Sequence, residues 1–197
     1  MWESSVPVPN LHTTLSNPIP TMDQTPQDGP RREAIPPRFY SEYEERPFLT
    51  CTRCGETLKD FDEGYQVAKI IKNGECTMEY AICVPCHERM LEEFSEESRR
   101  NMEEFQSKNV NPDLGPDTCA ICSIEHEEME NEEYALAAAC HQYDLLHAIM
   151  ICGKCSEKMQ DLVSKHTKGV WDKFFEENFP GVPADALPQP GGVPVIV

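Results

Sequence analysis

Positive charge is scarce in this sequence of 197 residues. Lysine and arginine together number 17 against 35 aspartate and glutamate residues, so the formal net charge is −18. A surface of that sign repels phosphate, which argues against a nucleic-acid or anionic-membrane partner. Long apolar runs are also missing, because stretches such as 148–152 are far too short to span a bilayer.

Several catalytic and targeting signals are absent as well. The sequence has no Ser/His/Asp grouping, no glycine loop that could cradle phosphate, and no paired carboxylates on an apolar background. The opening MWESSVPVPN has neither the basic nor the apolar segment of a secretory signal. We therefore expect a non-enzymatic protein of a reducing, cytoplasmic compartment without a membrane segment. In that setting, ten cysteines indicate metal ligands or reactive thiols rather than disulfides.

Two stretches lack the periodicity of folded elements. Residues 1–47, rich in Pro, Ser, Thr and Gln, predict a disordered tail, and residues 181–197, punctuated by Pro and Gly, predict a flexible one. The segment 38–49 (RFYSEYEERPFL) is an exception, because its aromatic residues give it something to bury.

The chain between the tails repeats itself. At a shift of 69 residues Cys83 meets Cys152 and Cys86 meets Cys155, and at a shift of 68 the pair CTRC meets CAIC. Such self-similarity indicates a duplicated module. We name residues 48–111 unit one and residues 112–180 unit two.

Each unit shows the same order of elements. A C-x2-C pair comes first, followed by a predicted β-hairpin, at 65–82 in unit one and 134–151 in unit two. Asn73-Gly74 between alternating strands is a strong two-residue turn signal. A second C-x2-C pair follows the hairpin, and a helix begins immediately after it.

This spacing predicts two metal sites. Two cysteines separated by two residues can direct both thiolates at one ion, and a second pair completes a tetrahedron of sulfur. Four soft thiolates favour zinc, with iron as the lesser option. We expect two Zn²⁺ ions per chain, bound in sequential order by Cys51, Cys54, Cys83 and Cys86, and by Cys119, Cys122, Cys152 and Cys155.

The knuckle, hairpin and ligand-bearing helix resemble the treble-clef zinc-finger superfamily. That resemblance implies a small α+β zinc-binding fold, here as two tandem treble-clef-like units with disordered tails. It implies fold and metal but not function, because treble clefs serve very different roles.

Other interpretations of Cys83-Val84-Pro85-Cys86-His87 are weaker. Haem attachment through C-x-x-C-H is disfavoured because Ser156, not histidine, follows the matched second pair. A dithiol redox enzyme needs one reactive pair, not four pairs at repeated spacing. We expect His87 to be a solvated residue of the first helical turn, and Cys76 and Cys140 to be small apolar strand residues.

The hairpins differ in their apolar pattern. In unit one Thr77 and Glu79 predict one solvent-facing side. Unit two is apolar at nearly every position, and residues such as Leu146 and Met150 call for a second covering surface. We expect that cover from within the chain, with Tyr40, Tyr43 or Phe48 as candidates.

These features favour a zinc-stabilised protein-protein interaction module or adaptor with a protein partner, its oligomeric state unspecified. Three alternatives stay open. They are a nucleic-acid-binding or transcription-related zinc-finger regulator, a ubiquitin-ligase-like protein with interleaved ligands, and a zinc-thiolate redox sensor.

Overall fold

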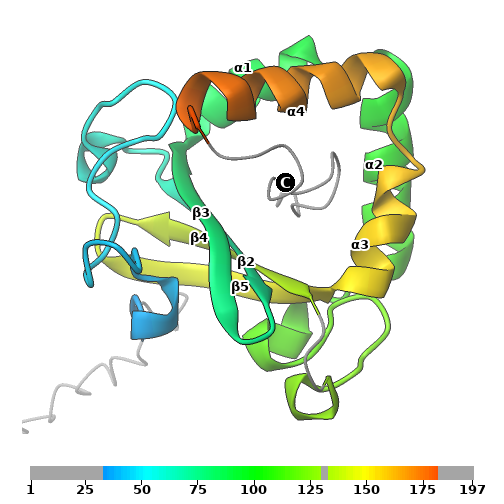
Figure 1. Ribbon diagram of the computed structural model, residues 1–197, viewed down its shortest axis with the longest axis horizontal. Helices are drawn as coiled ribbons and strands as arrows, with labels where there is room; N and C mark the ends of the chain where they lie inside the picture. The colour runs from blue at the N-terminus through cyan, green and yellow to red at the C-terminus, as the bar shows by residue number, and fades with distance from the viewer. Residues whose placement is uncertain (1–32, 130–132, 182–197) are drawn as a thin grey trace, which may run out of the picture.

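The computed structural model describes residues 33–129 and 133–181, and the rest of both predicted tails lies outside these ranges. One five-stranded antiparallel sheet, in the order β1-β5-β4-β2-β3, has four helices along one of its faces (Figure 1). The strands are β1 Glu33–Ala34, β2 Tyr65–Lys72, β3 Glu75–Cys83, β4 Tyr134–His141 and β5 Asp144–Cys152. The helices are α1 Val84–Glu93, α2 Glu96–Asn109, α3 Gly153–Gln160 and α4 Lys165–Asn178. Short 3-10 turns are η1 Pro37–Phe39, η2 Leu58–Asp60, η3 Pro112–Asp117 and η4 His126–Glu128.

Both predicted hairpins are confirmed. In the first, β2 pairs with β3 around Asn73 and Gly74, whose φ angles of 53° and 80° are those of a left-handed two-residue turn. In the second, β4 pairs with β5 around Gln142, which has a φ of 55°. Each hairpin delivers its last residue, Cys83 or Cys152, directly to the start of a helix.

The two hairpins join through their first strands. Strands β2 and β4 pair antiparallel, with Ala68 opposite Ala137, two positions related by the 69-residue shift. A second pair with the same shift meets at the helices, where Ser95 Oγ and Ser164 Oγ are hydrogen-bonded at 2.9 Å. The arrangement is therefore pseudo-two-fold, like the isologous interface of a symmetric dimer.

This pairing places the C-x2-C pairs at opposite ends of the sheet. The first residue of β2, Tyr65, lies opposite Cys83 on one side and Cys140 on the other. Each helix-starting cysteine thus lies near the turn of the other unit's hairpin. Contacts link these ends, because the Tyr65 hydroxyl donates to the Gln142 carbonyl at 3.0 Å, and a Cβ on Gly64 would lie 2.4 Å from the Cys140 carbonyl oxygen.

The helices cross between the units. Helix α4 of unit two lies over the hairpin of unit one, where the Tyr80 ring meets Phe174 edge-on at 5.4 Å and Phe175 at 6.4 Å. Trp171 stacks on Phe175 at 5.9 Å. The alanines of β4 leave room for these large rings on the central strands. Both units therefore share one sheet and one core, and the boundary between residues 111 and 112 stays a prediction.

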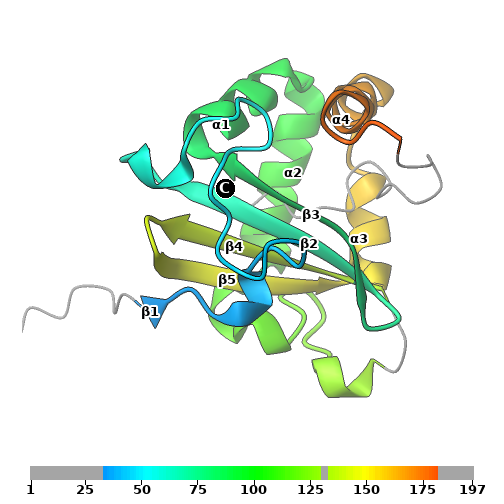
Figure 2. The same ribbon diagram turned by 60° about the vertical axis from the view of Figure 1, so that its left-hand side comes forward.

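The face of the sheet away from the helices is covered by the segment before β2 (Figure 2). Phe39 is fully buried and Ile35 nearly so, while Tyr40 and Phe48 pack against the core. The exception made for residues 38–49 is thus confirmed at Phe39, Tyr40 and Phe48. The predicted disordered tail is wrong for residues 33–37, because Ile35 is also part of this cover. The prediction that Tyr43 helps to cover the sheet is also wrong, because this residue is 94% exposed.

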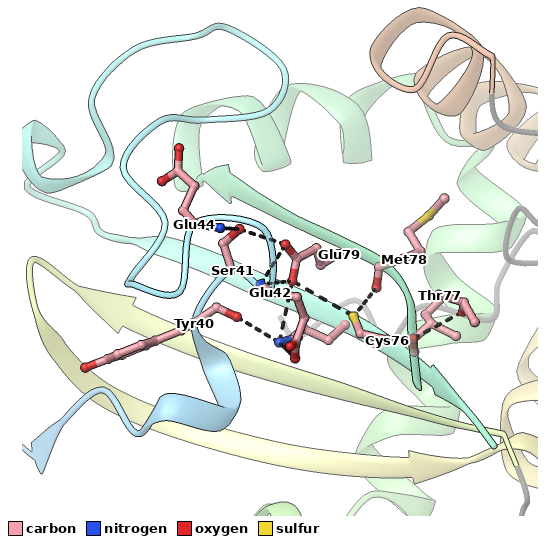
Figure 3. A network of polar contacts seen from close by, with 10 residues as sticks. Tyr40, Ser41, Glu42, Glu44, Cys76, Thr77, Met78 and Glu79 are labelled. Carbon is pink, nitrogen blue, oxygen red and sulfur yellow. Dashed lines mark hydrogen bonds and ion pairs between the residues drawn. The ribbon is translucent and has the colours of Figure 1, made fainter. Parts of the chain in front are cut away.

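Polar contacts fasten this segment to the sheet, where Ser41 and Glu42 lie beside Glu79 of β3 (Figure 3). Lys69 Nζ lies 2.7 Å from both the Tyr40 carbonyl and a Glu42 carboxylate oxygen, and 3.5 Å from Glu79. The Ser41 hydroxyl donates to Glu79 at 2.8 Å. The prediction that Glu79 faces solvent is therefore wrong, because its carboxylate contacts Ser41 and Lys69 beneath this segment.

The second hairpin is covered at Met150, which is fully buried, but not at Leu146, which is 51% exposed. A β-bulge between Ala139 and Cys140 in the β4–β5 register leaves Leu146 unpaired and turned outward. Thr77, at the matched position of β3, is left out by a similar bulge. The expectation of internal cover is confirmed for the body of the hairpin and wrong for Leu146.

We predict that Lys69→Met destabilises the fold by about 3 kcal/mol, because it leaves the Glu79 carboxylate without its cation in a mostly buried site. Lys72→Met is the matched control. Its side chain is 57% exposed beside Glu133, and its loss should cost no more than about 1 kcal/mol. Urea unfolding measures the stability of both variants. Equal effects of the two substitutions would contradict the role of Lys69 in fastening residues 40–42 to the sheet.

Candidate metal centres

The eight cysteines of the C-x2-C pairs gather into two clusters. In each cluster the four sulfur atoms lie within 4.8 Å of one another. Every cluster takes its cysteines from one unit, which confirms the expected sequential grouping. Cluster one is Cys51, Cys54, Cys83 and Cys86, and cluster two is Cys119, Cys122, Cys152 and Cys155.

The backbone shapes the first half of each cluster in the same way. The Gly55 N–H donates to the Cys51 carbonyl, and the Ser123 N–H donates to the Cys119 carbonyl. Both turns need a residue with positive φ, at 74° in Gly55 and 60° in Ser123. Glycine adopts this conformation without strain, whereas serine does so at some cost.

The second half of each cluster comes from a strand end and a helix start. The Cys83 N–H donates to Cys51 Sγ at 3.4 Å, and the Cys152 N–H donates to Cys119 Sγ at the same distance. The Thr52 N–H donates to the Ala81 carbonyl on the outer edge of β3. The knuckle is thereby fixed to the strand that carries the third sulfur.

The sulfur separations fit zinc. Four sulfurs at about 2.3 Å from a tetrahedral zinc lie about 3.8 Å from one another. Cys54 Sγ and Cys83 Sγ are 4.0 Å apart, and the corresponding pair in cluster two is 3.7 Å apart. All ten cysteines are free thiols.

The thiols cannot all ionise unaided. Burial raises the pKa of Cys119, but backbone N–H donors from Cys152, Cys122 and Ile121 outweigh it and lower the pKa to about 7. Burial raises the pKa of Cys152 to about 11 and that of Cys155 further. Cluster one shows the same division, with the pKa of Cys51 lowered and that of Cys83 raised. A divalent cation would supply the charge that four thiolates require.

Two arginines lie beside cluster one. Arg89 Nη2 donates to Cys86 Sγ at 3.0 Å, and Arg53 Nη1 donates to the Cys86 carbonyl at 3.1 Å. Sequence reasoning missed both, although Arg89 follows Cys86 by three residues and so lies on the same face of α1.

The expectation that His87 is a solvated residue of the first helical turn is wrong. The residue is 5% exposed, its Nε2 has no hydrogen-bond partner, and burial lowers its pKa to about 4. It lies under α4, in a small cavity of about 10 Å³ with Met90 and Trp171. Helix α4 of unit two buries His87, and the residues next to His87 in the sequence do not reveal this contact.

Cys76 and Cys140 lie in neither cluster. Burial raises their pKa values to about 11 and about 12, so both are neutral thiols on strands. Within residues 33–129 and 133–181, no further group of His, Cys, Asp or Glu converges as the two clusters do. The same residues include no helix long and apolar enough to cross a membrane.

Compared with models of known protein families, with curated proteins and with solved structures, the chain matches none. The two four-cysteine clusters therefore carry the assignment by their geometry: they fit a zinc-binding module.

We predict that Cys83→Ser or Cys152→Ser loses one zinc and destabilises the whole domain, because the shared sheet couples the two units. Removing a ligand takes away most of a centre's folding free energy, on the order of 10 kcal/mol. Cys76→Ser, on a strand outside the clusters, should keep two zinc ions and cost about 1 to 3 kcal/mol. Metal analysis and thermal unfolding measure these effects, and equal zinc loss in all three variants would contradict the ligand assignment.

Proposed function

We propose that the protein is a non-enzymatic, zinc-stabilised interaction module of a reducing compartment, built from two duplicated treble-clef-like units. Zn²⁺ held by each cluster supplies charge neutralisation and a rigid link between knuckle, strand end and helix start. A protein partner binds the surface that the two centres hold in shape.

The observation that carries this proposal is the closed donor set. Four thiols in each cluster fill the coordination shell of a tetrahedral zinc, whereas catalytic zinc keeps one position open for water or substrate. Both clusters share this geometry, which supports structural roles for both ions.

A groove on the surface supports a protein partner. It encloses about 280 Å³ beside the β4–β5 turn, between the knuckle of unit one and the turn of unit two. Leu49 and Tyr143 line it and are 39% and 56% exposed. Large apolar side chains left open beside a groove are typical of a surface that binds another protein.

Unit two has different residues at the positions that correspond to this groove. Its knuckle is preceded by Pro116 and Asp117 where unit one has Phe48 and Leu49. The first hairpin turns at Asn73-Gly74 where the second has Gln142-Tyr143. The groove arises where the two units differ, which favours a single asymmetric partner.

We predict that Tyr143→Ser abolishes partner recovery when the full-length protein is affinity-purified from its native host with crosslinking. Tyr43→Ser is the matched control, because Tyr43 is 94% exposed but lies outside the groove. Both variants should keep two zinc ions and the wild-type melting temperature. Identical partner recovery by the two variants would contradict the proposal that the partner binds in this groove.

The runner-up, a nucleic-acid-binding regulator, predicts tight and salt-dependent binding to a duplex. Each zinc with four thiolates adds −2 to the formal −18, so the loaded protein would carry about −22. We expect only weak, non-specific DNA binding at physiological salt. A fluorescence-anisotropy titration tests this, and a sub-micromolar dissociation constant at that salt would reverse the ranking of the two functions.

A further inference from the structure

We propose that the two centres differ in reactivity: peroxide releases the zinc of cluster two before the zinc of cluster one. This inference rests on the proposed zinc sites and adds a redox response to them. It follows from the groups that surround otherwise matched sulfurs.

Cluster one is screened by guanidinium groups. Arg89 Nη2 donates to Cys86 Sγ at 3.0 Å, and its Nε donates to the Pro85 carbonyl at 3.2 Å, so the planar group is held at two points. Arg53 bridges the Cys86 carbonyl and the Glu93 carboxylate on α1. These contacts direct fixed N–H donors at one sulfur and at the backbone that carries it.

Cluster two has different residues at the matched positions. Lys158 stands where unit one has Arg89, and Ile121 stands where it has Arg53. Lys158 is exposed, and among the described residues it donates no hydrogen bond to a sulfur of its cluster. Lys154 adds a second nearby charge, so the clusters differ in donor geometry more than in charge. An ammonium group is a mobile point charge, whereas guanidinium is a rigid fork.

A hydrogen bond from a cation withdraws electron density from a thiolate. Thiolate nucleophilicity falls with basicity, and groups around the ligands of a metal tune its reactivity. The sulfur bonded to Arg89 should therefore react more slowly with an electrophile than its counterpart Cys155. Arg53 holds the knuckle against α1 through the Cys86 carbonyl and Glu93, and these contacts oppose loss of the metal.

Cys54 and Cys122 are the exposed members of their clusters, so exposure does not separate the two centres and the difference rests on the arginine contacts of cluster one. Within cluster two, Cys122 is the thiolate that a peroxide reaches first. Its sulfur attacks one peroxide oxygen, the O–O bond breaks, and a sulfenic acid and hydroxide form. Cys152 Sγ, 3.7 Å away, then attacks the Cys122 sulfur and displaces a second hydroxide. One disulfide forms, two electrons pass to the peroxide, and Zn²⁺ leaves because two of its four ligands are lost.

Metal release would free the knuckle of unit two from the sheet edge. In the folded state the Ala120 N–H donates to the Met150 carbonyl at 2.8 Å, and both Ala120 and Met150 are buried. Loss of zinc would expose these apolar residues, while cluster one keeps the opposite end of the sheet intact. The redox response would thus change one end of the molecule.

The test uses the full-length zinc-loaded protein treated with hydrogen peroxide, with released zinc followed by a chromophoric chelator. We expect two phases of one zinc each, and mass spectrometry after the first phase should find the Cys122–Cys152 disulfide. Lys158→Arg should slow the first phase, and Arg89→Lys should speed the second, each by about threefold or more. Lys108→Arg, on the exposed face of α2, is the control and should change neither phase.

The outcomes separate this inference from the proposed function. A purified protein without zinc would overturn the zinc sites themselves. Two zinc ions released in one phase, first oxidation within cluster one, or no effect of either reciprocal substitution would overturn only the difference between the centres.

Discussion

Four sulfur atoms held within 4.8 Å of one another cannot all carry negative charge unless a cation lies among them. That constraint recurs at both ends of this sheet. Backbone N–H donors ease it for one thiol in each cluster, as the lowered pKa values of Cys51 and Cys119 show. Burial raises the pKa of Cys54, Cys83, Cys152 and Cys155, so the arrangement makes chemical sense as a zinc site and little sense as a cluster of free thiols.

The sheet makes the two clusters interdependent. Through the β2–β4 pairing each cluster lies next to the hairpin turn of the other unit, and α4 of unit two covers the strands of unit one. A metal that fixes Cys83 at the end of β3 therefore also supports the surface on which Phe174 packs. The two units therefore form one folded body with a cysteine cluster at each end of its sheet. The groove beside Tyr143 is lined by residues of both units.

Local patterns in the sequence predicted the hairpins, the helix starts and the grouping of the cysteines. Asn73-Gly74 fixes a turn by backbone preference alone, and the C-x2-C spacing limits where its sulfurs can point. The failures share one cause, which is packing between segments distant in sequence. His87 is buried by a helix of unit two, and Glu79 by residues 40–42, so neither burial could be read from neighbours along the chain. Leu146 is exposed by a bulge that alternation does not reveal.

X-ray absorption at the zinc edge on the purified protein tests the central claim most directly. The account predicts a first shell of four sulfur atoms at about 2.3 Å, averaged over two zinc ions per chain, with no nitrogen or oxygen ligand. A shell containing nitrogen or oxygen, a different metal, or no bound metal would contradict it.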